Sequence, residues 1–174
     1  MHKKFQQIKE EYDKFYKSLL KVGRLPVKQT SHGFWGVSAA DDVFDLFRKI
    51  KLQNAKSFID IGSGDGKVVM IASLFTKATG IEIDNELHAQ AINAQKNLRL
   101  NVSIIKDDYR KYDLSKYDVI FLNPDSPLHE LEPKLHRELK GKLLVFGHMY
   151  HPEFLQKEAT HDCCGTLVSV YKKP

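Results

Sequence analysis

Ser57-Phe-Ile-Asp-Ile-Gly-Ser-Gly-Asp-Gly-Lys-Val-Val-Met70 is the stretch of the sequence that decides the fold. The short apolar run at its start predicts a buried parallel strand, and the apolar run from Val68 to Phe75 predicts a buried helix. The glycines between them therefore form a strand-to-helix turn. At such a turn the backbone N–H groups are unpaired, and glycine carries no side chain that keeps a ligand at a distance. The stretch thus predicts a ligand site built largely from backbone.

The spacing of the glycines discriminates between possible ligands. Dinucleotide sites have the pattern Gly-x-Gly-x-x-Gly, whereas Lys67 occupies the third small position here. The pattern instead resembles the first motif of class I S-adenosylmethionine (SAM) dependent methyltransferases, in which an acidic residue, here Asp60, ends the strand. The resemblance implies SAM as the cofactor, with its methionine end against Gly62, Ser63 and Gly64. That end carries an amine and a sulfonium but no phosphate, so an acidic strand end suits it.

Beyond this turn, strand and helix patterns alternate with short connections. Alternation of this kind predicts an α/β fold with a mostly parallel twisted sheet and helices on both faces. The expected architecture is a single-domain, Rossmann-like class I methyltransferase fold with an added N-terminal helix and a C-terminal antiparallel hairpin at the sheet edge. The expected elements are helices at 3–21, 39–50, 68–75, 86–98 and 128–139, a first strand that Asp60 ends, strands at 78–83, 102–105, 117–122 and 142–146, and a hairpin at 155–172.

The net charge of +5 is concentrated at the N-terminus. Residues 1–28 hold eight Lys and Arg against three acidic residues, so this segment alone accounts for the excess. We expect 1–28 to be a basic amphipathic helical segment and 29–174 to be the methyltransferase domain. The basic excess points to an acidic partner, either a protein surface or a nucleic-acid backbone, while a solvated helix face is the alternative.

Residues 28–38 show no periodicity and contain the only tryptophan, so we predict a loop. Phe34 and Trp35 are expected to form a lid over the cofactor, because large rings supply apolar area and face a cation well. Alternatively, Trp35 pins down the N-terminal helix. Ser38 is expected to cap the helix that follows.

Acidic residues also follow the second and third strands. Glu82, with Ile83 beside it, lies about 20 residues after the first glycine, the spacing at which a carboxylate accepts from ribose hydroxyls. The end of the third strand resembles the third methyltransferase motif, which implies that Asp108 recognises the adenine amino group, with Tyr109 beside it. Asp107 is the alternative.

Asn123-Pro124-Asp125-Ser126 ends the fourth strand and faces the position of the methyl group. These residues are half of the Asn-Pro-Pro-aromatic motif of methyltransferases that act on amines of DNA and RNA bases. We expect Asn123, Asp125 and Tyr109 to be catalytic residues that orient the acceptor, and Asn123 to contact the cofactor as well. Phe34, Trp35 and Tyr150 are further candidates for the lining of an acceptor channel.

The run from Asp108 to Val119, the glycine turn and the helix around Leu131–Leu135 look like the small seven-strand protein-lysine methyltransferases. That group includes an archaeal broad-specificity enzyme and a mitochondrial enzyme acting on the ATP synthase c-subunit, and the resemblance runs from about Gly33 to the C-terminus. It implies an N-methyltransferase whose partner is a protein with an accessible lysine. An RNA, DNA or small-molecule amine is the alternative acceptor, and a SAM-binding protein without catalysis is the third possibility.

The composition limits the remaining possibilities. A length of 174 residues, 42% of them hydrophobic and 28% charged, fits one globular domain. No apolar run is long enough to span a bilayer, and no secretory signal is recognised, so we expect a cytoplasmic protein. Cys163 and Cys164 are adjacent, which suits a reducing compartment, and we expect no metal site, although three nearby histidines make a Cys/His cluster the alternative.

Overall fold

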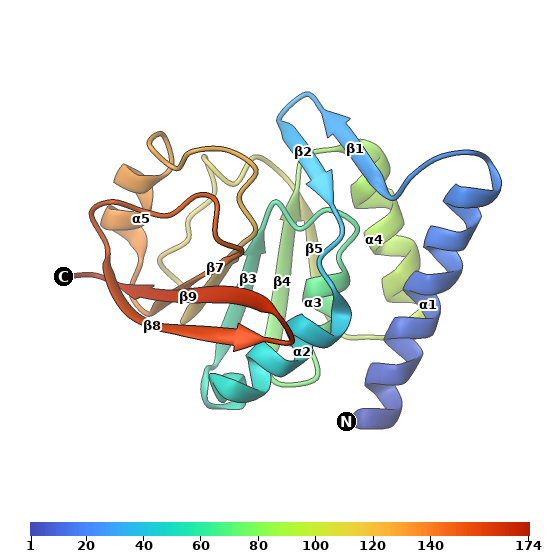
Figure 1. The fold of residues 1–174 in the computed structure, drawn as a ribbon, viewed down its shortest axis with the longest axis horizontal. Helices are drawn as coiled ribbons and strands as arrows, with labels where there is room; N and C mark the ends of the chain where they lie inside the picture. Colours follow the sequence, from blue (N-terminus) through green and yellow to red (C-terminus); the bar gives the residue numbers. More distant parts are fainter.

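Seven strands form one sheet in the order β5-β4-β3-β6-β7-β9-β8 (Figure 1). The computed structural model describes all 174 residues. The five strands from β5 to β7 are parallel, β9 is antiparallel to β7, and β8 forms the edge. The predicted fold class, including the edge hairpin, is confirmed. The bounds of the strands are β3 (Ser57–Ile61), β4 (Lys77–Glu82), β5 (Ser103–Lys106), β6 (Val119–Leu122), β7 (Lys142–Phe146), β8 (Gln156–Cys163) and β9 (Thr166–Lys172).

Helices cover both faces of the sheet, but unequally. Side chains alternate between the faces along each strand, so Phe58 of β3 enters one apolar core and Ile59 enters the other. Four helices contribute to the core around Phe58, and one contributes to the core around Ile59. The four are α1 (His2–Lys21), α2 (Ala40–Lys49), α3 (Lys67–Ala72) and α4 (Asn85–Leu98), and the fifth is α5 (Glu132–Glu138). A short 3-10 turn (Leu52–Asn54) precedes β3.

The N-terminal helix α1 packs on the domain through one face. Ile8 and Tyr12 are fully buried, and the Phe5 ring stacks on that of Phe44 of α2 with centroids 4.0 Å apart. The helix therefore buries its apolar stripe against α2, α3 and α4 and leaves most of its lysines exposed. A division of the chain at residue 28 stays a prediction. No helix combines the length and the hydropathy that are needed to cross a membrane.

The loop prediction for 28–38 was wrong. The chain forms an antiparallel hairpin of β1 (Val27–Thr30) and β2 (Gly33–Gly36), with Lys28 opposite Trp35. Strands of four residues are too short for periodicity to reveal them. Gly33 permits the tight turn with a φ of 138°, and the Thr30 hydroxyl donates to its carbonyl at 2.8 Å.

Two helix starts also differ from prediction. Ser38 does not cap α2, because Ala39 is the N-cap residue and the Ser38 hydroxyl accepts a hydrogen bond from Asn123 instead. The last helix begins at Glu132 and not at Leu128, since the chain first makes a turn in which Leu128 O accepts from Leu131 N at 2.9 Å. At Ser38 the local capping signal was outweighed by a contact with a residue 85 positions away.

Candidate active site

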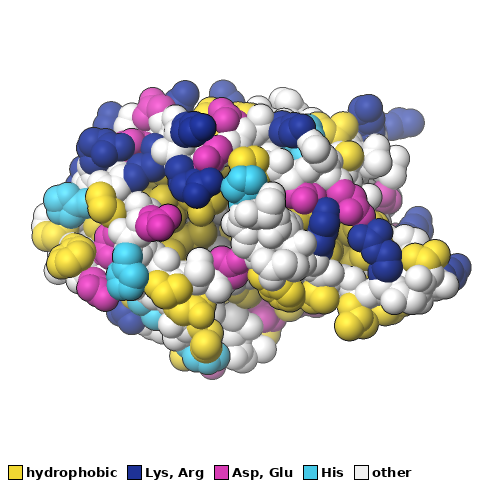
Figure 2. All heavy atoms as spheres, turned by 90° about the horizontal axis from the view of Figure 1, so that it is seen from above, with side chains coloured by type: hydrophobic (Ala, Val, Ile, Leu, Met, Phe, Trp, Pro, Cys, Tyr) yellow, Lys and Arg dark blue, Asp and Glu magenta, His cyan; other side chains and the backbone are white.

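A cavity of about 560 Å³ lies at the carboxyl ends of β3, β4 and β6, beneath the β1–β2 hairpin. In the space-filling view, apolar side chains form a hollow surrounded by basic and acidic side chains together (Figure 2). The structure brings most of the predicted site residues into the lining of this cavity. These are Phe34, Trp35, Asp60, Gly62, Ser63, Gly64, Glu82, Ile83, Tyr109, Asn123 and Asp125.

Three predicted residues do not line the cavity, namely Asp107, Asp108 and Tyr150. Asp108 pairs with Arg110, whose Nε lies 2.9 Å from Oδ1, and this ion pair lowers the pKa of the carboxyl. The Asp107 carboxylate accepts from the backbone N–H of Asp108 at 2.7 Å. Both acidic side chains are therefore occupied within their own turn, while Arg110 lines the cavity.

The glycine turn approaches β4 closely. The N–H groups of Gly62 and Ser63 both donate to Ile81 O at 3.0 Å, and Gly64 N donates to Glu82 Oε2 at 2.7 Å. Gly62, Gly64 and Gly66 all have positive φ, which other residues adopt only with strain. A Cβ at Gly64 would also clash with the indole of Trp35. Both the conformation and the space at Gly64 therefore require glycine.

Asp60 and Glu82 place two carboxylates at the buried end of the cavity. No protein donor hydrogen-bonds Asp60, which is 3% exposed, and burial together with the charges of Glu82 and Asp65 raises its pKa well above the ordinary value. Glu82 accepts from Gly64 N and, at 2.8 Å, from Asp84 N. The Ser63 hydroxyl is buried without a partner. The site thus offers unpaired polar atoms to a cationic ligand, which fits the amine and sulfonium of SAM.

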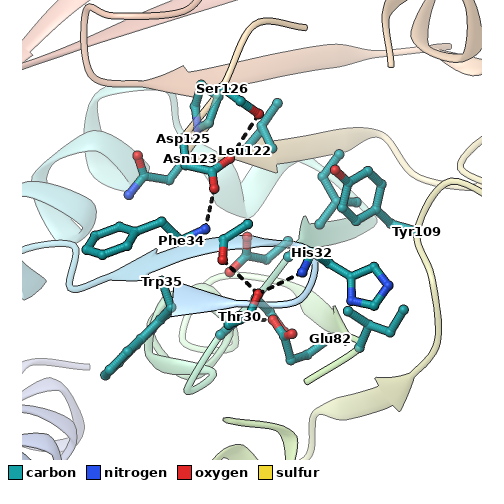
Figure 3. A pocket seen from close by; sticks show the side chains of 18 of the residues that line it. Thr30, His32, Phe34, Trp35, Glu82, Tyr109, Leu122, Asn123, Asp125 and Ser126 are labelled. Atoms are coloured by element: carbon teal, nitrogen blue, oxygen red, sulfur yellow. Dashed lines mark hydrogen bonds between the residues drawn. The ribbon is translucent and has the colours of Figure 1, made fainter. Parts of the chain in front are cut away.

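The other side of the cavity is formed by the end of β6 and the hairpin (Figure 3). Asn123 Nδ2 donates to the Ser38 hydroxyl at 3.1 Å, which fixes the amide. The Asp125 carboxylate accepts from the backbone N–H of Phe34 and, at 3.1 Å, from the hydroxyl of Ser126. Burial raises the pKa of Tyr109, which keeps its hydroxyl protonated. Asp125 therefore holds the β1–β2 hairpin against the end of β6.

The side chain of Trp35 lines two cavities. Its indole lies on Gly64 in the main cavity and also lines a second cavity of about 240 Å³ that contains Phe15 and Leu19 of α1. The two sequence-based interpretations of this residue are compatible, because one side chain lies between the glycine turn and the N-terminal helix.

Sequence reasoning missed a group of residues that joins α1 to the glycine turn. The hydroxyl of Tyr12 donates to Asp65 O at 2.9 Å, and that of Tyr16 donates to Asp65 Oδ2 at 2.6 Å. Lys67 lines the main cavity and lies under both rings. The spacing of these tyrosines in the sequence is that of ordinary core positions of an amphipathic helix. The only sequence feature that indicated a special role here is the lysine directly after the last glycine.

The fold and the site together define a class I SAM-dependent methyltransferase. The family model described as the ANTKMT methyltransferase domain matches residues 60–157. The chain belongs to this family, in agreement with its resemblance to the small protein-lysine methyltransferases. A comparison with curated protein sequences found no match.

Solved structures share the fold. An RNA methyltransferase from Salinibacter ruber in complex with S-adenosyl-L-homocysteine has a TM-score of 0.69 and 24% identity, over 79% of this chain and 94% of that one. The mitomycin 7-O-methyltransferase MmcR has a TM-score of 0.64 and 13% identity, over 76% and 53%. A SAM-dependent methyltransferase from Aquifex aeolicus has a TM-score of 0.58 and 18% identity, over 75% and 89%.

Proposed function

We propose that this methyltransferase transfers the methyl group of SAM to the side-chain nitrogen of a lysine in a protein substrate. The observation that carries the proposal is the lining of the cavity at the end of β6, where Asn123, Asp125 and Tyr109 stand beside apolar and aromatic side chains. A lysine has a long apolar stem and a cationic end, which such a lining accommodates. Membership of the family supports the same acceptor.

The cofactor roles follow from the contacts around the glycine turn. We assign the amine of the methionine moiety to Asp60, the one carboxylate there without a protein donor. We assign the ribose hydroxyls to Glu82, whose oxygens each keep a lone pair beyond their backbone contacts. The remaining cofactor contacts would come from Gly62, Ser63, Gly64 and Ile83. The indole of Trp35 would cover the bound cofactor. The adenine roles of Asp108 and Asp107 stay predictions.

Methyl transfer requires a neutral amine, because its lone pair attacks the methyl group while the bond from that carbon to sulfur breaks. Bound SAM supplies the electrophilic methyl group and the leaving group. A free lysine, with a pKa of about 10.4, is almost fully protonated at neutral pH. Removal of the ammonium from water favours its neutral form. Asn123 Oδ1 would then accept from the amine and align its lone pair, and Asp125 or water would receive the proton.

Nucleic acid is the second candidate acceptor. Asn123-Pro124 is half of the motif of base methyltransferases, and one structure with the same fold is an RNA methyltransferase. Phosphate recognition, however, depends on unpaired Lys and Arg around the site. The lining contains one arginine and one lysine. Arg110 is paired with Asp108, and Lys67 is buried. The lining therefore favours a protein acceptor.

The test is transfer of labelled methyl groups from SAM to a protein mixture and, separately, to total RNA. We expect label in the protein fraction that resists ribonuclease, and methyl-lysine in its acid hydrolysate by mass spectrometry. The matched control is the same protein mixture with its lysines acetylated beforehand, which should accept no label. Label that ribonuclease releases would contradict the proposal in favour of RNA, and saturable SAM binding with no transfer would indicate a protein without catalysis.

An Asn123→Ala variant separates acceptor orientation from cofactor binding. Without its amide, we expect kcat to fall by about 10² to 10⁴, the range for a group that aligns a reacting amine, and SAM affinity to fall much less, because Asn123 is only one of several expected cofactor contacts. The matched control is Asn97→Ala, which removes an exposed amide that donates to Glu11 away from the cavity. Equal activity of both variants would contradict the role of Asn123.

A further inference from the structure

Lys67 is a buried lysine whose ammonium has no anionic partner in the protein. The residue is 4% exposed. Its Nζ lies 4.8 Å from the ring centroid of Tyr16 and 5.9 Å from that of Tyr12. It donates no side-chain hydrogen bond, and no carboxylate lies within 4.0 Å of it. Burial of a cation without a paired anion costs folding free energy, which suggests that the ammonium has a role other than stability.

Asp65, the acidic residue whose charge acts most strongly on Lys67, is occupied by other donors. Its Oδ2 accepts from the hydroxyl of Tyr16 at 2.6 Å, and its Oδ1 accepts from the backbone N–H of Lys67 at 3.2 Å. Its backbone carbonyl accepts from Tyr12 at 2.9 Å. The carboxylate therefore fixes the glycine turn to α1 and does not pair with Nζ.

The surroundings of Nζ make the charged form of Lys67 less favourable in the free protein than in water. Burial lowers the pKa of Lys67 to about 8, and the charges of Asp65 and Asp13 only partly oppose this effect. The other titratable groups packed against it are the phenols of Tyr12 and Tyr16, which burial keeps protonated. A carboxylate beside Nζ would favour the charged form and raise this pKa.

Lys67 lines the same cavity as Asp60 and Gly64. The methionine moiety of SAM is a zwitterion, so an anion beside its amine and a cation beside its carboxylate would complement both of its charges. Asp60 is the unpaired carboxylate and Lys67 is the unpaired ammonium. The aromatic rings of α1 add favourable cation–π contacts that hold the ammonium in place.

We propose that Lys67 binds the carboxylate of the cofactor's methionine moiety, with Tyr12, Tyr16 and Asp65 as the positioning residues that hold the lysine and the turn. The N-terminal helix is then part of the cofactor site. This inference depends on binding of the cofactor alone and not on the proposed acceptor, so it is tested in the absence of any acceptor.

The first test compares SAM with decarboxylated SAM, which lacks only the carboxylate, by isothermal titration calorimetry. Lys67→Met keeps most of the stem length and removes the charge. We expect it to weaken SAM binding by about tenfold to a hundredfold, the range for a lost charge-assisted hydrogen bond, and to leave binding of decarboxylated SAM within about twofold. Lys67→Arg should retain most of the preference for SAM. Equal losses for both ligands would overturn the proposal.

The matched control is Lys134→Met, which removes a buried ammonium from the opposite face, where Lys134 pairs with Glu138 at 2.7 Å. This variant should lose stability but keep the wild-type ratio of the two affinities. A change of that ratio equal to the one in Lys67→Met would also overturn the proposal, because the effect would then be general.

The second test uses the wild-type protein and remains available if Lys67→Met does not fold. In protein labelled with ¹³C at lysine Cε, the Lys67 signal is assigned from its loss in Lys67→Arg, and its titration is followed by NMR. We expect a midpoint near 8 that rises by at least about one pH unit with S-adenosylhomocysteine and does not move with methylthioadenosine, which lacks the amino-acid end. A midpoint that S-adenosylhomocysteine leaves unchanged would overturn the proposal.

Discussion

The backbone N–H of Gly64 donates a hydrogen bond to the carboxylate of Glu82 at 2.7 Å. This contact joins the turn after β3 to the end of β4, and both partners line the cavity. Glu82 has a second structural contact through the N–H of Asp84. The residue assigned to the ribose therefore also shapes the turn that surrounds the methionine moiety.

Replacement of Glu82 should consequently affect stability and cofactor affinity together. In Glu82→Ala the buried N–H of Gly64 loses its acceptor, which costs about 1–3 kcal/mol of folding free energy. We expect SAM affinity to fall by more than tenfold, measured by calorimetry, and the urea midpoint to fall with it. Glu82→Gln retains one acceptor and should be intermediate. Unchanged SAM affinity in Glu82→Ala would contradict the assignment of this residue.

Replacement of Asp60 should change stability and SAM affinity in opposite directions, unlike replacement of Glu82. Its pKa in the folded state is raised by burial and by the charges of Glu82 and Asp65. Its contribution to stability is therefore fully present below the ordinary carboxyl pKa and is lost as the pH rises through the raised value. Asp60→Asn abolishes this loss, so at pH 7 we expect a gain of about 0.5–2 kcal/mol in the free protein, together with weaker SAM binding.

Thermal unfolding between pH 5 and pH 8 checks the sign of the Asp60 effect. The advantage of Asp60→Asn over wild type should grow as the pH rises. Asp41→Asn is the control, because Asp41 is an exposed residue paired with Lys9 and should change stability by less than about 0.5 kcal/mol. A variant that is less stable than wild type at pH 7 and binds SAM normally would contradict the role of Asp60.

The sequence was sufficient to predict the parallel sheet and the glycine turn. Apolar runs such as that of β3 are bounded by glycine and polar residues, and the resulting alternation permits few topologies. The strand ends that carry Asp60, Glu82 and Asn123 follow directly from that topology, because parallel strands deliver their carboxyl ends to one edge.

Contacts between distant segments could not be predicted in this way. The pairing of Asn123 with Ser38 spans 85 positions, and the contacts of Tyr12 and Tyr16 with Asp65 span about 50. No local pattern encodes such pairings. The β1–β2 hairpin was missed for a different reason, since its strands of four residues are too short to show a periodicity.

The hydroxyl of Tyr16 should matter for the cofactor turn and not only for folding. Tyr16→Phe removes the donor to Asp65, which costs about 1–2 kcal/mol and lets the carboxylate move. We expect SAM affinity to fall by about threefold to tenfold, with faster hydrogen exchange at the Gly66 amide. Tyr112→Phe is the control, because its hydroxyl meets that of Tyr117 at 3.2 Å away from the cavity. Equal affinity of the two variants would contradict a role of α1 in cofactor binding.

Asp125 should control the position of the hairpin over the cavity. Its carboxylate accepts from the backbone N–H of Phe34, and a Cβ on Gly33 would lie 2.5 Å from it, so hairpin and strand end are in close contact. Asp125→Ala removes the acceptor, and we expect hydrogen exchange at the Phe34 amide to rise by at least about tenfold, with a higher KM for SAM. Asp125→Asn keeps an acceptor oxygen and should retain most of the protection. Protection at Phe34 that persists in Asp125→Ala would show that other contacts hold the hairpin.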